Sequence, residues 1–217
     1  SDNKLGQKAT MFYDPRGQVI RTVNPDESRQ QVIYGVPRKL DDPDDYDPTP
    51  WQVYTYDPND NAGRTHPDSS GAFEHCYDTP ASATIDALGR TIETVERNRT
   101  REKVNGKLAW SGIEELYTQS TYDIRGNVLT VMDALGRDAF RHVYDLADNP
   151  LRIDSIDAGI RRTVLDAAGN EIERRDSKKA LTLNEYDSLN RPTRLWARDD
   201  ADQSVTLREK IIYGDSD

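Results

Sequence analysis

Polar and apolar residues alternate along short stretches of the chain. Examples are residues 91–96 (TIETVE), 150–154 (PLRID) and 171–174 (EIER). Because successive side chains of a β-strand point to opposite faces of a sheet, a period of two predicts strands with one drier and one wetter face. The pattern therefore predicts an all-β fold.

Each alternating stretch follows a turn signal that begins with aspartate. Asp123, Asp145, Asp166 and Asp187 recur every 21 or 22 residues, in the segments YDIRGN, YDLADN, LDAAGN and YDSLNR. A period in the twenties is typical of stacked repeat arrays. Further turn signals lie about half a period away, at Asp133, Asp157, Asp176 and Asp199. Each unit is therefore predicted to hold two strands and two turns, and consecutive hairpins should pair side by side in an antiparallel sheet.

The turn positions hold residues that suit a tight reversal of the chain. Asp at the first position can accept a hydrogen bond from the amide two residues later, and the fourth residue must take a positive φ. Gly adopts that conformation readily, and Asn or Asp does so at modest cost. The predicted structural turn residues are Asp14 with Gly17, Asp86 with Gly89, Asp123 with Gly126, Asp133 with Gly136, Asp145 with Asp148, Asp166 with Gly169, and Asp187 with Asn190.

Three segments depart from the repeat, although we expect one array over residues 1–217. Residues 36–50 (VPRKLDDPDDYDPTP) are rich in Asp and Pro and predict an exposed acidic loop that breaks the sheet. Residues 58–80 predict an irregular connection. Residues 100–118 predict a hairpin insertion around Asn105-Gly106, a strong two-residue turn signal. Residues 111–119 are a separate candidate for one or two amphipathic helical turns.

Composition changes this interpretation little. A hydrophobic content of 35% and a net charge of −10 approach the range of disordered chains. However, a sheet with one dry face needs few aliphatic residues, and 11 Tyr and 3 Trp supply apolar area. The acidic balance argues against nucleic-acid binding. We see no apolar run of membrane length and no signal peptide, and the single cysteine excludes an intrachain disulfide.

The Tyr-Asp-x-x-Gly-Asn/Arg turn at a period near 21 residues resembles the YD (Rhs) repeat of bacterial Rhs proteins, insecticidal toxin-complex components and teneurins. The stretches WQVYTYDPNDNAGRTHP (51–67) and TPASATIDALGRTIETVERNR (79–99) resemble the B component of the toxin complexes in particular. The resemblance implies that the hairpins form a long curved sheet, part of a spiral shell that encloses a toxic polypeptide.

The same resemblance implies partners and a location. The partners would be the remaining Rhs-repeat shell of the parent chain and a C-type toxin component with its enclosed cargo. The location would be secreted or extracellular, as part of a larger bacterial toxin with a role in virulence. The chain carries neither the propeller of a complete B component nor a recognisable toxin domain or self-cleavage site of a C component.

One segment has the rhythm of a calcium-binding loop. Asp57, Asn59, Asn61 and Asp68 occupy its first, third, fifth and twelfth positions, and such oxygen ligands suit calcium. Ala62 stands where the sharp turn of such a loop needs Gly, so a polar loop that caps a strand is the alternative.

We expect no catalytic residue and no cofactor. His66, His75 and Cys76 lack a repeated zinc-ligand spacing, and adjacent His75 and Cys76 would point to opposite faces of a strand. The many aspartates are needed in turns, where a hydrogen-bonded carboxylate has a lowered pKa that is unsuited to a general acid.

Two functions therefore remain open. The chain is either a structural part of a toxin-enclosing shell or a module that binds carbohydrate or a receptor through Trp51, Tyr54, Tyr56 and Trp110. Binding needs these aromatic side chains to be exposed on a rigid surface, whereas a shell would bury them.

Overall fold

A computed structural model describes residues 6–214, and the chain divides into two compact units, Ser1–Gln119 (unit 1) and Ser120–Asp217 (unit 2). The strands that begin in unit 1 are β1 (Thr10–Tyr13), β2 (Val19–Val23), β3 (Arg29–Pro37), β4 (Tyr46–Tyr56), β5 (Ala81–Ile85), β6 (Thr91–Val104) and β7 (Lys107–Tyr122). Those of unit 2 are β8 (Val128–Met132), β9 (Asp138–Tyr144), β10 (Pro150–Ser155), β11 (Gly159–Leu165), β12 (Glu171–Asp176), β13 (Leu181–Tyr186), β14 (Pro192–Arg198) and β15 (Thr206–Lys210).

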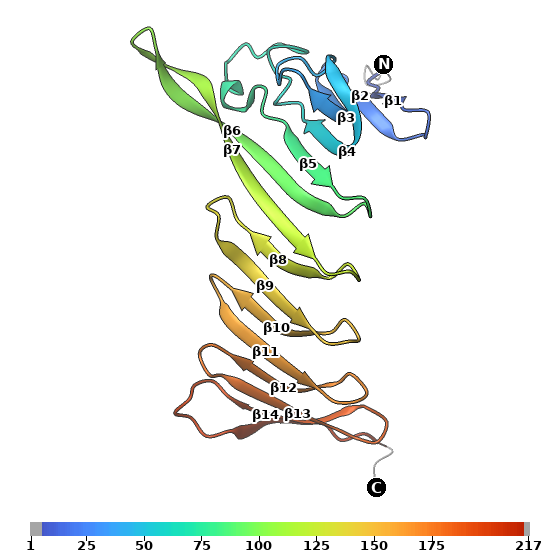
Figure 1. Cartoon of the computed structure of the whole chain (residues 1–217), viewed down its shortest axis with the longest axis vertical. Coiled ribbons are helices and arrows are strands. Elements are labelled where there is room, and N and C mark those ends of the chain that lie inside the picture. The colour runs from blue at the N-terminus through green and yellow to red at the C-terminus, as the bar shows by residue number, and fades with distance from the viewer. Residues whose placement is uncertain (1–5, 215–217) are drawn as a thin grey trace. The chain divides into compact units, whose positions relative to one another are not determined.

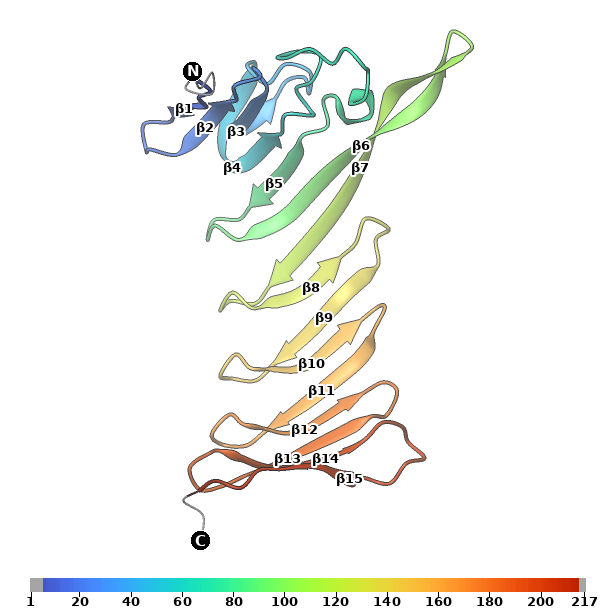
Figure 2. The ribbon, with the colours of Figure 1, turned by 180° about the vertical axis from the view of Figure 1, so that it is seen from behind.

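The prediction of an all-β, antiparallel hairpin fold is confirmed. The hydrogen-bonded order of the strands is their order in the sequence, β1 to β15, as can be followed in Figure 1 and Figure 2. Among residues 6–214 the helical content is one 3-10 turn, η1 (Glu74–Cys76), and no helix there has the length and apolarity needed to cross a bilayer.

The hairpins that turn at an aspartate share one connection. In the last of them Tyr186 pairs with Pro192 and Glu185 with Arg194, so residues 187–191 form the turn and the register shifts by one residue beside it. The same shift occurs beside the turns that begin at Asp14, Asp86, Asp133, Asp145 and Asp166. A β-bulge next to each turn sharpens the twist of the strands, so the repeat preserves the bulge as well as the turn.

Unit 1 has a buried core on one face of its strands. Along β3 the buried residues alternate, and Ile33 lies in a cross-strand row with Tyr54 of β4, Ser82 of β5 and Val95 of β6. Two connections are tied to the same strand, because the Gln31 amide donates to the Pro43 carbonyl and the Asn61 amide donates to the Arg29 carbonyl. The loops of unit 1 therefore serve as the second layer of its core.

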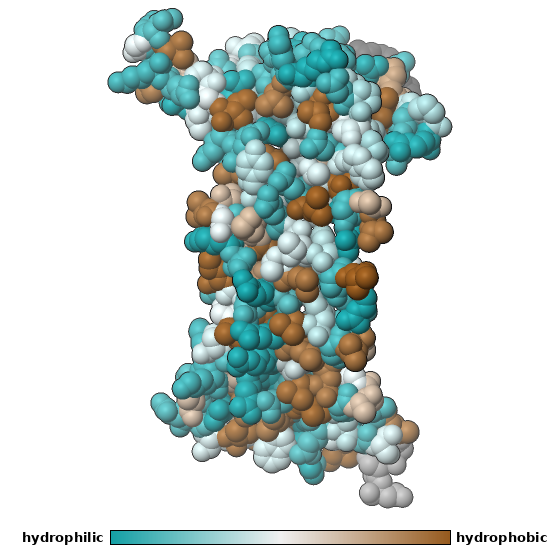
Figure 3. All heavy atoms as spheres, in the orientation of Figure 1, coloured by the Kyte–Doolittle hydropathy of each residue, from teal (hydrophilic) through white to brown (hydrophobic). Residues whose placement is uncertain are grey.

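Unit 2 lacks such a layer. Leu181 is its only buried residue among those the structure describes, and the other strand residues are half-buried or exposed on both faces. Figure 3 shows hydrophilic and hydrophobic residues interspersed over the strands of this unit. Within residues 120–214, no segment covers either face of this sheet.

The prediction of an acidic loop over residues 36–50 is wrong at both ends. Val36 and Pro37 complete β3, and residues 46–50 belong to β4, so only residues 38–45 lie outside the strands. Gly35 makes this pairing possible, since a Cβ atom there would lie 2.5 Å from the Asp47 carbonyl oxygen. Pro37 ends β3, where its missing N–H costs no interior ladder bond, and Pro50 lies among residues 49–52, which have no partner on β3 because the register shifts there.

The helical prediction for residues 111–119 is also wrong, because they pair along β7 with β6 from Gln119 to Gly112 and onward to the turn. The predicted insertion at 100–118 is thus the outer part of two long strands that turn at Asn105-Gly106. Residues 57–80, between β4 and β5, hold η1 and one isolated bridge, Ala62 with His66.

Candidate functional site

The recurrent turn is held by its aspartate. In the turn at Asp145, one carboxylate oxygen accepts the backbone N–H groups of Ala147 and Asn149, at 2.8 and 2.9 Å. The other oxygen accepts the Asn149 side-chain amide at 3.0 Å. The same two backbone bonds form at Asp14, Asp86, Asp123, Asp133, Asp166 and Asp187.

The residue after the positive-φ position completes the motif. Where it is Asn, its amide donates to the aspartate, as at Asn127, and where it is Arg, its Nε does so, as at Arg191. This contact accounts for Asn or Arg at the sixth position of the motif, and in the first turn, where that residue is Gln18, Arg16 Nε donates to Asp14 instead. The positive-φ residues are Gly17, Gly89, Gly126, Gly136, Asp148, Gly169 and Asn190, with φ between 60° and 98°.

These bonds lower the pKa of the turn carboxyls. The pKa of Asp145 lies below its ordinary value first because the Asn149 amide donates to it, and that of Asp187 first because the Arg191 backbone N–H does. The pKa values of Asp14, Asp86, Asp123, Asp133 and Asp166 are lowered by the same kinds of bond. Such groups remain ionised at neutral pH and are poor proton donors.

The tyrosine of the motif ties one strand to the next. The Tyr144 hydroxyl donates to the Val128 carbonyl and the Tyr186 hydroxyl donates to the Glu171 carbonyl, each at 3.0 Å. Leu165 occupies the equivalent position in the repeat between them and has no hydroxyl to donate. The aromatic position therefore contributes a specific hydrogen bond in addition to apolar area.

The calcium-loop residues are engaged within the protein. The Asp57 carboxylate accepts the Asp60 N–H, and the Asn61 oxygen accepts Nη2 of Arg64 at 2.5 Å. Asp68 accepts the N–H groups of Ala72 and Phe73 together with the Tyr77 hydroxyl. Asn59 has no such tie, and within residues 6–214 no group of three or more His, Cys, Asp or Glu side chains is arranged to hold a metal ion.

A polar cluster at the end of β4 was not foreseen from the sequence. Asp60 is buried, and its carboxylate accepts the Asp57 N–H at 2.7 Å and the Thr79 hydroxyl at 2.9 Å. Burial raises the pKa of Asp60 to about 6, and the nearby Asp57 carboxylate adds to the rise. Nothing in the local sequence distinguishes Asp60 from the neighbouring loop aspartates.

Arg97 is the second unforeseen residue. Its side chain is 4% exposed, and its Nη1 donates to the Pro80 carbonyl at 2.7 Å and to the Ser82 hydroxyl at 3.0 Å. Its Nε donates to Glu115 at 2.9 Å, and its guanidinium lies 5.1 Å from the centre of the Tyr54 ring. The alternating pattern of β6 placed Arg97 on one face of the strand but did not show that this face is covered.

The four aromatic candidates for ligand binding do not form one platform. Tyr56 is fully buried, which contradicts its predicted role as an exposed binding residue, and the ring of Tyr54 contacts Arg97. Trp51 is 49% exposed on β4. Trp110 lies on the outer part of β7 beside Arg101 and His75.

The histidine and cysteine candidates lie in the connection between β4 and β5. His75 and Cys76 belong to η1, not to a strand, and His66 bonds with the hydroxyl of Thr65. Burial raises the pKa of the Cys76 thiol, which keeps it protonated and weakly nucleophilic. His142 lies between Phe140 and Tyr144 on β9, with ring centres 6.3 and 6.0 Å away.

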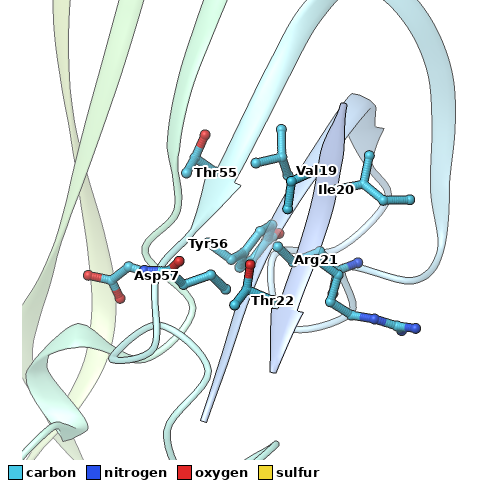
Figure 4. A pocket seen from close by; sticks show the side chains of 10 residues that line it. Val19, Ile20, Arg21, Thr22, Thr55, Tyr56 and Asp57 are labelled. Carbon is cyan, nitrogen blue, oxygen red and sulfur yellow. The ribbon is translucent and has the colours of Figure 1, made fainter. Parts of the chain in front are cut away.

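The hollows of the two units are shallow. Figure 4 shows one of about 190 Å³ in unit 1, where Val19, Thr22, Thr55 and Tyr56 line the ends of β2 and β4. Another, of about 510 Å³ in unit 2, is lined by Phe140, His142, Ile153, Arg161 and other residues of β9 to β12. Ser155, Asp157, Asp176 and Lys178 also line the second hollow.

The two faces of unit 2 differ in chemistry. Phe140, His142 and Tyr144 share one face of β9, and Ile153 and Arg161 lie across from His142 on β10 and β11. The opposite face carries a cross-strand row of Arg152, Arg162 and Arg175, with Asp154 and Glu173 paired to its outer members.

Comparison with known proteins identifies the fold. No protein-family model matches the chain, and no curated protein is similar to it in sequence. Among solved structures, a TcdB2-TccC3-Cdc42 crystal structure matches with a TM-score of 0.75 and 20% identity over 98% of this chain. This chain has the fold of a segment of these toxin-complex proteins.

Two further toxin-complex structures agree. A TcdB2-TccC3 crystal structure matches with a TM-score of 0.73 and 19% identity over 98% of this chain. A Photorhabdus luminescens Tc holotoxin pore matches with a TM-score of 0.75 and 20% identity over 95% of it. The chain spans 9% to 10% of the length of the chains it matches, so it is similar to one segment of each.

Proposed function

We propose that this chain is a structural segment of a hollow repeat shell, which encloses a toxic polypeptide and helps to deliver it as part of a bacterial toxin complex. One observation carries the proposal: the sheet of unit 2 is a single layer that buries only Leu181 among its described residues, while turn aspartates such as Asp145 hold the backbone amides of their own turns. The likeness to Tc toxin structures supports the same role.

A single layer of hairpins suits a wall better than a globule. An isolated globular domain buries apolar side chains between two layers, whereas unit 2 buries only Leu181 among its described residues. Unit 2 is held together instead by the backbone hydrogen bonds between its strands and by the hydrogen bonds within each turn. A wall built in this way can be lengthened by adding hairpins, and it leaves one face free to meet an enclosed polypeptide.

The proposed role is structural and not catalytic. The turn aspartates are committed to backbone amides, and their lowered pKa values make them poor general acids. The proposed partners are the remaining Rhs repeats of a longer parent chain and a C-type toxin component with its enclosed cargo. The proposed location is that of a secreted toxin acting outside the producing bacterium.

The test uses neighbouring residues that point to opposite faces. Thr163 and Val164 are adjacent on β11, Thr163 opposite Arg174 and Val164 opposite Glu173. Each is changed to Cys in a Cys76→Ser background of the full-length protein, and labelling by a bulky maleimide-polyethylene glycol is timed. A closed shell predicts that one position labels at least about tenfold more slowly than the other, because one face lines an interior.

The 217-residue chain alone is the matched control. No segment within residues 120–214 covers either face of unit 2, so both positions should label at similar rates in this chain. Equal labelling of Thr163→Cys and Val164→Cys in the full-length protein would show that both faces meet solvent and would contradict the shell.

A further inference from the structure

The outer part of the β6–β7 hairpin extends beyond the neighbouring strand. Strand β5 pairs with β6 only as far as Val95, whereas β6 and β7 continue to pair with each other up to Val104 and Lys107. Figure 1 and Figure 2 both show the tip projecting past β5. The outer part of β6 therefore has no neighbouring strand on the β5 side.

The base of this hairpin is anchored to the connection between β4 and β5. Arg99 donates from Nε to the Tyr77 carbonyl at 2.7 Å and from Nη2 to the Asp78 carboxylate at 2.9 Å. The Trp110 ring lies 6.0 Å from the His75 ring. Because these contacts fix the base, a partner that binds the tip meets a largely ordered surface and pays less ordering entropy.

One face of the tip combines positive charge with apolar area. Arg101 pairs across the hairpin with Trp110, and Lys103 pairs with Leu108, so all four side chains share a face. The Arg101 guanidinium lies 4.6 Å from the centre of the Trp110 ring, and Leu108 is 64% exposed. A hollow of about 510 Å³ lies beside this face. Its lining residues are Arg101, Leu108 and Trp110 of the face, together with Glu74, Tyr77, Arg99 and Ala109.

The charge of the tip opposes that of the chain. The stretch RTREKVNGKLAW (99–110) holds four cations and one carboxylate, in a chain with a net charge of −10. Glu102 accepts the Ser111 hydroxyl on the opposite face, and Arg99 is paired with Asp78. None of the ion pairs described in residues 6–214 involves Arg101, Lys103 or Lys107.

We propose that the face formed by Arg101, Lys103, Leu108 and Trp110 is a docking surface for an acidic polypeptide segment with apolar side chains between its carboxylates. Carboxylates would pair with Arg101 and Lys103, and an apolar side chain would cover Leu108 and the edge of Trp110. Complementary charge steers such a segment to the tip, and exposed apolar area holds it there.

Nucleic acid fits this face less well. The cationic strip is a few residues long, whereas phosphate backbones bind through many cations along a stripe, and the remainder of the chain would repel them. The proposal does not depend on the shell, since it concerns only the hairpin tip of unit 1.

The test measures binding of a fluorescein-labelled decapeptide of alternating Glu and Leu to the 217-residue chain by anisotropy. We expect saturable binding that weakens as salt rises, because the surface is exposed. Arg101→Glu with Lys103→Glu should weaken it at least about tenfold. The matched control Lys178→Glu with Lys210→Glu makes the same change in net charge elsewhere and should change the affinity by less than about twofold.

A second variant distinguishes loss of the binding surface from loss of the hairpin structure. Lys103→Glu with Leu108→Ser leaves the Arg101–Trp110 contact and the Arg99 anchors in place, and it should also weaken binding at least about fivefold. The proposal is overturned if the unaltered chain shows no saturable binding of the peptide. It is overturned, too, if the control variant Lys178→Glu with Lys210→Glu weakens binding as much as Arg101→Glu with Lys103→Glu does. It is also overturned if single-stranded DNA of ten nucleotides binds more tightly than the peptide.

Discussion

The Asn127 side-chain amide donates to the Asp148 carboxylate at 2.6 Å and so joins two turns that are one repeat apart. Arg125 adds to the link by donating to the Leu146 and Asp145 carbonyls of the same second turn. The turns that begin at Asp166 and Asp187 are joined in the same way, since the Asn170 side-chain amide donates to the Asn190 side-chain oxygen at 3.1 Å. Asp148 and Asn190 thus shape their own turns and each accepts a bond from the turn one repeat earlier.

This link predicts that Asp148→Gly destabilises the array. Gly relieves the cost of positive φ at a site where Asp has φ of 67°, which by itself would stabilise the turn. The variant also removes the acceptor of Asn127 and an ion pair with Arg125. We expect a net loss of about 0.5–1 kcal/mol in the free energy of unfolding, measured by urea denaturation.

The control is a double-mutant cycle with Asn127→Ala. Because Asn127 and Asp148 are coupled, the double variant should lose at least about 0.5 kcal/mol less than the sum of the two single variants. Additive losses would show that the turns fold independently of one another.

Removal of a tyrosine hydroxyl should lower the free energy of unfolding at Tyr144 and Tyr186 but not at Tyr56. Tyr144→Phe and Tyr186→Phe each remove a hydrogen bond to a carbonyl of a neighbouring strand and should each cost about 1 kcal/mol. The buried Tyr56 hydroxyl has no partner among the described residues, so Tyr56→Phe should be neutral or stabilising. Urea midpoints of the three variants check this, and equal losses at all three would refute the assignment.

Asp60 of unit 1 and the turn aspartates of unit 2 should respond to acid in opposite directions. The turn aspartates of unit 2 have lowered pKa values, so the stability they confer is present above the unfolded pKa of about 3.9 and is lost as the pH falls through their folded values. Burial raises the pKa of Asp60 in unit 1 to about 6, so its contribution is greatest below pH of about 3.9 and is lost as the pH rises toward 6.

Hydrogen exchange read by mass spectrometry distinguishes the units. Between about pH 4 and 6, amides of β3 to β5 should lose protection as the pH rises, after correction for the intrinsic rate, whereas amides of β9 to β14 should not. Asp60→Asn should reduce the trend in unit 1, and because burial also raises the pKa of Asp78, a smaller trend should remain. A trend unchanged in that variant would assign it to another group.

The close pairing of β3 with β4 predicts that Gly35→Ala is strongly destabilising. A Cβ atom at this position would lie 2.5 Å from the Asp47 carbonyl oxygen and 2.7 Å from the Tyr46 ring, so the strands must separate. We expect a loss of about 2 kcal/mol or more, measured by thermal unfolding. Gly214→Ala, where a Cβ atom meets nothing within 4 Å, is the control and should be neutral.

The hairpin architecture could be predicted from the sequence because each turn is encoded within six residues. Asp145, its amide donors and the positive-φ residue Asp148 all lie in one segment, so local stereochemistry determines them. The register shift of one residue beside each of these turns was not predicted from the alternation of polar and apolar residues.

The core of unit 1 could not be predicted in the same way. Arg97 binds the Pro80 carbonyl and Asn61 binds the Arg29 carbonyl, contacts between segments that are far apart in the sequence. Alternation along β4 shows that Tyr54 and Tyr56 share a face, but it does not show that loops cover that face. For this reason Tyr56 was expected to bind a ligand and instead lies in the core.

The most direct test of the shell is a cryo-electron microscopy map of the full-length protein that contains this chain. The account predicts that the strands of unit 2 form a wall one sheet thick, with one face toward solvent and the other toward an internal cavity. A map in which both faces of unit 2 pack against other domains, or in which the particle has no internal void, would contradict it.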